Sequence, residues 1–147
     1  MNSNWRAFFA FAHDVCAAGI AWSLLYGLRF NFDVPEAQAA DLMVSLAWIL
    51  PLQAVIFLGF GLYRGLWRFA SILDLQRIVL SAGLGAILIP LVIVMLQLQA
   101  SVPRSVLILY PLVLIFLMAG NRFAYRIWKE HRLYSPLAAL GEPVLVA

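Results

Sequence analysis

The chain has 147 residues, of which 65% are hydrophobic and 12% are charged, about half the charged share of an ordinary soluble domain. So few charged side chains cannot cover a water-soluble core of this size, which excludes a soluble globule and predicts a protein embedded in lipid. The net charge of +3 gives no reason to expect a nucleic-acid partner, and a single cysteine excludes an intramolecular disulfide and a cysteine-based zinc site.

Four apolar stretches are long enough to cross a membrane as helices, since a span needs about 20 residues. They cover residues 7–28, 42–62, 78–98 and 105–121. The first stretch is too long for the apolar core of a signal peptide, and three more spans follow it, so we expect it to be retained. The predicted fold class is an all-α membrane protein, with a four-transmembrane-helix bundle over residues 1–134.

Asp14 is the only acidic residue inside a predicted span, and a carboxylate within the bilayer is costly enough to suggest a function. Two interpretations are open. In the first, Asp14 forms an intramembrane ion pair near the inner leaflet with one of four arginines: Arg64, Arg68, Arg122 or Arg126. In the second, Asp14 carries protons in an exporter, because small multidrug transporters resemble this outline of four spans with a carboxylate in the first.

Small residues predict where helices approach one another closely. They share one face of the first span with Asp14, and they recur between Ser81 and Ala86 in the third.

The connection between the second and third spans contains a polar amphipathic segment, residues 63–70. Arg64 and Arg68 share one helical face, and leucines and Phe69 form an apolar stripe on another. We expect this segment to lie along the inner leaflet, with Trp67 at the level of the headgroups and the two arginines against lipid phosphates or a partner carboxylate. Ser71 followed by Asp74 then predicts a helix that starts at Ile72 and continues into the third span.

The region after the fourth span is predicted to continue as a helix into the cytoplasm. Arg122, Arg126 and Lys129 recur there at helical spacing, and the helix is expected to end near Ser135 and Pro136. Residues 135–147 are predicted to be a linker followed by a buried strand that begins at Val144. Because a lone strand has no sheet partners, we expect a longer protein of which this chain is the front end.

Lysine and arginine gather in alternate connections of the predicted bundle. Eight of the ten fall before the first span, between the second and third, and after the fourth: Arg6, Arg64, Arg68, Arg77, Arg122, Arg126, Lys129 and Arg132. Only Arg29 and Arg104 fall in the other two connections. The positive-inside rule therefore predicts that both termini are cytoplasmic. The predicted interface or docking residues are seven of these eight cations, all except Arg6, and Trp67.

The chain offers no constellation that could carry catalysis. We find no nucleophile beside a base, no paired catalytic carboxylates and no glycine-rich phosphate loop. His13 and His131 have no second ligand at metal spacing. We therefore expect no catalytic, cofactor or metal site, and no enzyme activity, within residues 1–147.

Four sequence motifs together resemble a known family. They are F-G-L-Y-R-G-L-W-R-F-A-S (60–71), D-L-Q-R-I (74–78), V-P-R-S-V (102–106) and N-R-F-A-Y-R (121–126). Over nearly the whole chain they resemble the amino-terminal membrane region of bacterial nucleoside-diphosphate-sugar dehydratases of the UDP-N-acetylglucosamine 4,6-dehydratase type. The resemblance implies that a Rossmann-type domain begins at residues 143–147, and that NAD and the nucleotide sugar bind in that domain and not in this chain.

The resemblance implies a membrane anchor or docking domain in capsule, O-antigen or protein-glycan synthesis, placed in the bacterial inner membrane. The expected partners are a bilayer with anionic headgroups, a second copy of the chain, and other membrane enzymes of glycan synthesis. Polyprenyl-phosphate sugar-1-phosphate transferases are similar in arrangement, with four amino-terminal helices before a Rossmann-like segment. They are the alternative, as is the small proton-coupled exporter.

Overall fold

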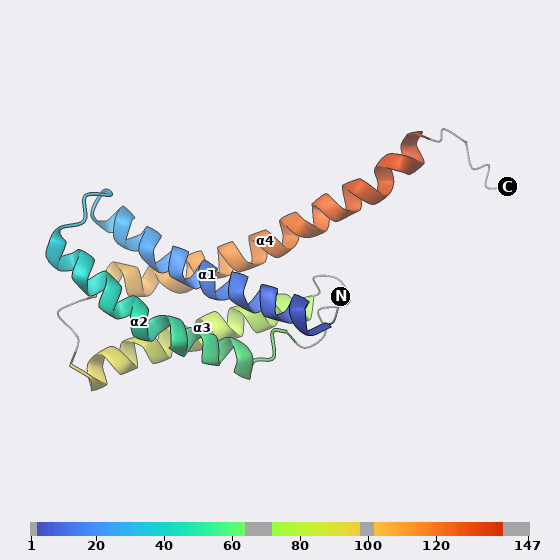
Figure 1. Ribbon diagram of the computed structural model, residues 1–147. Helices are drawn as coiled ribbons and strands as arrows, with labels where there is room; N and C mark the ends of the chain where they lie inside the picture. The colour runs from blue at the N-terminus through green and yellow to red at the C-terminus, as the bar shows by residue number, and fades with distance from the viewer. Residues whose placement is uncertain (1–2, 64–71, 98–101, 140–147) are drawn as a thin grey trace.

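The computed structural model describes residues 3–63, 72–97 and 102–139, and this part of the chain is all-helical. Four helices follow one another: α1 (Ser3–Arg29), α2 (Glu36–Gly59), α3 (Ile72–Met95) and α4 (Arg104–Ala139) (Figure 1). All four are long and apolar enough to cross a membrane. Two parts of the predicted fold class are thereby confirmed: the described chain is all-helical, and it contains four apolar helices of membrane length.

The helices form a ring in which each one packs against two neighbours. α1 lies against α2 and α4, and α3 lies against α2 and α4. Consecutive helices run in opposite directions, so the start of α1, the end of α2 and the start of α3 meet at one end of the bundle (Figure 1). α4 leaves the bundle at that same end and continues alone.

Two helices end in the same hydrogen-bonded turn, in which a residue with positive φ closes the helix. At the end of α2, Gly61 has φ 62°, its N–H donates to Leu58 O (3.1 Å), and the N–H of Leu62 donates to Phe57 O (3.4 Å). Leu62 is buried against the core cluster that contains Phe57. The turn therefore ends α2 at Gly59, whereas the apolar run in the sequence predicts a span that extends to residue 62.

α1 ends in the equivalent way, with Asn31 at the positive-φ position (52°). Its N–H donates to Leu28 O (3.4 Å), and the N–H of Phe32 donates to Gly27 O (2.6 Å). A Cβ on Gly27 would lie 3.0 Å from the Phe32 ring, so the glycine leaves the space that the ring occupies.

Aromatic side chains fill the core at the end of the bundle opposite to the exit of α4. Trp22 and Tyr110 are buried and meet edge to face, with ring centroids 5.0 Å apart. The indole Nε1 of Trp22 donates to Ser45 Oγ (3.0 Å), and that hydroxyl donates onward to Leu42 O (2.8 Å). This chain of contacts ties α4 to α1 and α1 to α2.

The helix boundaries differ from the predicted spans mainly in α4. This helix has 36 residues, which at 1.5 Å per residue makes it about 54 Å long, well beyond the ~30 Å hydrocarbon core. It runs to Ala139, past Ser135 and Pro136, where an end was expected. α3 starts at Ile72, as expected. The segment 64–70, the residue Ser71 and the strand expected at residues 143–147 lie outside the described residues.

Candidate functional site

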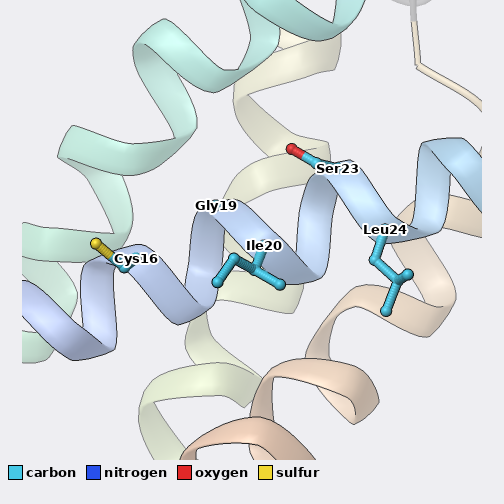
Figure 2. Close-up of a pocket in the computed structure, with 5 residues that line it drawn as sticks. All are labelled: Cys16, Gly19, Ile20, Ser23 and Leu24. Atoms are coloured by element: carbon cyan, nitrogen blue, oxygen red, sulfur yellow. The ribbon is translucent and has the colours of Figure 1, made fainter.

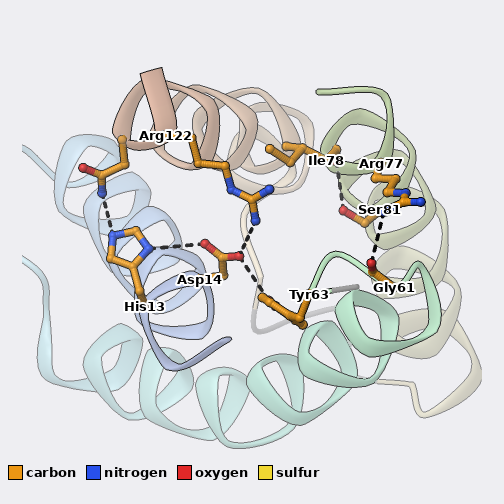
Figure 3. Close-up of polar contacts among 9 residues, drawn as sticks. His13, Asp14, Gly61, Tyr63, Arg77, Ile78, Ser81 and Arg122 are labelled. Carbon is orange, nitrogen blue, oxygen red and sulfur yellow. Dashed lines mark hydrogen bonds and ion pairs between the residues drawn. The ribbon is translucent and has the colours of Figure 1, made fainter. Parts of the chain in front are cut away.

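A buried carboxylate lies near the end of the bundle at which α4 leaves. The Asp14 side chain, on α1, is 3% exposed, and its Oδ2 lies 2.9 Å from Arg122 Nη2 on α4. Tyr63, in the turn after α2, donates its hydroxyl to the same oxygen at 3.1 Å. Figure 3 shows the arginine and the tyrosine converging on Asp14 from two different elements. Of the four arginines that the sequence offered to Asp14, Arg122 makes the pair.

A second contact between α1 and α4 lies directly beside the first. His13 Nε2 lies 2.6 Å from Asn121 Nδ2, and His13 Nδ1 lies 3.3 Å from Asp14 Oδ1 (Figure 3). Because a carboxylate only accepts, the ring nitrogen that faces Asp14 is the donor in this contact, and the imidazole links Asn121 of α4 to Asp14 of α1. We call these five residues the polar clasp: His13, Asp14, Tyr63, Asn121 and Arg122.

The turn that places Tyr63 is itself held by α3. Arg77 Nη1 donates to Gly61 O at 3.4 Å, and Leu62 is buried below it. Burial raises the pKa of Tyr63 above its ordinary value, and the negative charge of Asp14 raises it further. The hydroxyl therefore stays protonated and acts as a donor to the clasp.

Two other predicted site residues, Arg126 and Lys129, lie further along α4. Arg126 Nε pairs with Glu130 Oε1 (3.0 Å) one turn along the exposed part of α4, and Lys129 is exposed on the same helix. Arg64, Trp67 and Arg68 lie outside the described residues, as does the side chain of Arg132.

Sequence reasoning did not assign Tyr63, His13 and Asn121 to this site. Tyr63 belongs to the segment that was expected to lie along the inner leaflet, and His13 was considered as a metal ligand. The available signals were the positions of His13 next to Asp14 and of Asn121 next to Arg122.

A second polar side chain is buried between α2 and α3, nearer to the end of the bundle at which α4 leaves. Gln53 is 0% exposed, and neither of its amide atoms has a hydrogen-bond partner among the described residues. It lies against Gly85, where an added Cβ would come within 2.6 Å of Gln53 Oε1. The expected close approach at residues 81–86 is therefore filled at Gly85 by a side chain of α2.

Gly85→Ala is expected to destabilise the bundle by about 1–3 kcal/mol, because the new methyl group overlaps the enclosed amide. The matched control is Gly83→Ala, since a Cβ there would meet nothing within 4 Å. Unfolding in mixed detergent micelles measures both. In a Gln53→Ala background, Gly85→Ala should cost much less stability, because the side chain that it overlaps is gone. An equal loss of stability with glutamine and with alanine at position 53 would contradict this contact.

An open groove follows the outer surface of α1. It is lined by Cys16, Gly19, Ile20, Ser23 and Leu24 (Figure 2). Only one hydroxyl and one thiol are polar there, and a Cβ on Gly19 would lie in ordinary contact with Leu50 of α2 (3.5 Å). The groove is open along the side of the helix, so its chemistry is that of a helix surface.

The chemistry of the clasp is that of an interhelical tie. Its one fixed cation neutralises its one carboxylate, and the tyrosine and the imidazole satisfy the remaining acceptors. Within the described ranges no three His, Cys, Asp or Glu side chains come together as metal ligands. Comparisons with family models, with curated proteins and with solved structures give no match.

Proposed function

We propose that this bundle anchors the catalytic domain of a nucleotide-sugar dehydratase to the cytoplasmic face of the bacterial inner membrane. The course of α4 carries the proposal, because the helix leaves the bundle without a break and reaches Ala139 (Figure 1). From Arg122 to Ala139 it extends about 26 Å. An unbroken helix is a stiff connection, so a domain attached to it would stay at a fixed distance from the bilayer.

The distribution of cations supports cytoplasmic termini. Arg29 and Arg104 stand at one end of the helices, at the end of α1 and the start of α4. The described cations at the other end are more numerous: Arg6, Arg77, Arg122, Arg126 and Lys129. The positive-inside rule assigns the richer end to the cytoplasm.

The choice of a dehydratase rests on the four motifs that resemble that family, of which F-G-L-Y-R-G-L-W-R-F-A-S is the longest. In this proposal the bundle adds no chemistry to the reaction. It raises the effective concentration of the dehydratase near membrane enzymes that use its product on a lipid carrier.

The clasp supports an anchor more than an exporter. A proton-carrying carboxylate must gain and lose its partners in every cycle. Asp14 is instead nearly inaccessible and is held by an arginine at 2.9 Å and by a tyrosine at 3.1 Å. These contacts suit a fixed tie between helices.

The test uses the native reading frame that contains this chain. If the frame encodes a dehydratase, the purified membrane protein should convert UDP-N-acetylglucosamine to the 4-keto-6-deoxy sugar in the presence of NAD. Removal of the bundle should release that activity from the membrane fraction and leave its turnover nearly unchanged. Transfer of a sugar phosphate to polyprenyl phosphate would favour the transferase instead, and proton-coupled efflux that requires Asp14 would favour the exporter.

A further inference from the structure

Two groups of exposed aromatic side chains lie beyond the clasp, toward the end of the bundle at which α4 leaves. On α1, Trp5, Phe8 and Phe9 contact one another with ring centroids 6.1–6.4 Å apart, and all three are more than half exposed. On α4, Phe123, Tyr125 and Trp128 are also more than half exposed.

The two groups lie at similar depth, because α1 and α4 are antiparallel and their register is fixed at two points. Asp14 meets Arg122 near one end, and Trp22 meets Tyr110 further along. Residues that precede Asp14 are therefore level with residues that follow Arg122. The six aromatic residues occupy these corresponding stretches.

That depth coincides with the edge of the hydrocarbon core. A core about 30 Å thick takes up about 20 helical residues. Counted from Arg104 along α4 it ends near Ala124, and counted back from Arg29 along α1 it ends near Phe9. Tryptophan and tyrosine prefer this level, where their rings meet the headgroups.

The same turns of α4 are positively charged. Arg126 and Lys129 are exposed beside Tyr125 and Trp128, and Glu130 is the only acidic residue between residues 121 and 131. Cations at headgroup level are complementary to lipid phosphates.

We propose that the first turns of α1 and the root of α4 form a collar that binds anionic phospholipids in preference to zwitterionic ones, in the leaflet at this end of the bundle. The collar consists of Trp5, Phe8, Phe9, Phe123, Tyr125, Arg126, Trp128 and Lys129. The collar is part of the bundle, so this proposal does not depend on the proposed catalytic domain after α4.

Native mass spectrometry of the whole chain tests the collar, with phosphatidylglycerol and phosphatidylcholine of equal acyl length as probes. The chain should retain phosphatidylglycerol in preference. Arg126→Gln with Lys129→Gln should reduce that preference roughly tenfold or more, given the attraction of each cation to an anionic surface. Glu130→Gln should increase it.

Arg29→Gln with Arg104→Gln is the matched control, since it removes the same charge at the opposite end of the bundle. Equal retention of both lipids would overturn the proposal, as would an equal effect of the two charge-removal pairs. A dimer that forms through the aromatic residues of α4 and excludes lipid would also overturn it, in favour of a second copy of the chain.

Discussion

Asp14→Ala is expected to destabilise the bundle by about 3–5 kcal/mol, the usual cost of breaking a buried ion pair by removing one partner. The substitution leaves three donors without their acceptor at once: the guanidinium of Arg122, the hydroxyl of Tyr63 and the Nδ1 proton of His13. The guanidinium cannot lose its charge to reduce the cost. Reversible unfolding in mixed micelles, followed by helical circular dichroism, measures the change.

Arg126→Ala is the matched control for this prediction, because its pair with Glu130 is exposed and such pairs contribute about 0–1 kcal/mol. The double variant Asp14→Ala with Arg122→Ala should lose less stability than the two single variants added together. Additive losses, or an Asp14→Ala protein as stable as the parent, would show that the clasp does not hold the helices together.

Trp22→Ala is expected to cost about 3 kcal/mol, at the low end of large-to-small core substitutions, because lipid reduces the transfer contribution and leaves mainly the lost packing. Trp22 is fully buried, meets Tyr110 edge to face and donates to Ser45. Trp22→Phe should lose only the hydrogen bond and some contact area, about 1 kcal/mol.

Trp5→Ala provides the comparison for Trp22, since Trp5 is 55% exposed on the same helix. It should change stability by no more than about 0.5 kcal/mol. The same micelle unfolding assay serves all three variants. A loss at Trp5 as large as the loss at Trp22 would place the packed core of the bundle elsewhere.

Hydropathy was sufficient to find the four helices, because a helix that crosses lipid must be apolar along about 20 residues whatever it packs against. It could not find the end of α2. Residues 60–62 are apolar enough to continue the span, yet the positive φ of Gly61 closes the helix there. That boundary depends on backbone conformation, and the glycine was the signal for it.

The clasp was only partly accessible to sequence reasoning. Asp14 stood out as a carboxylate in a span, and Arg122 was one of four candidate partners. The choice among them depends on which helices are neighbours and on their register, and a single sequence contains neither. Tyr63 has the residue type of an interface anchor, but the turn after α2 directs its hydroxyl to Asp14 instead.

The position of the clasp gives α4 the properties of a lever. Arg122 ties the helix to α1 through its ion pair with Asp14, and the helix continues to Ala139, about 26 Å further at 1.5 Å per residue. Over that length a tilt of about 10° at the clasp moves the far end by about 4–5 Å. Rearrangements near Asp14 too small to alter the bundle would thus be amplified where α4 ends.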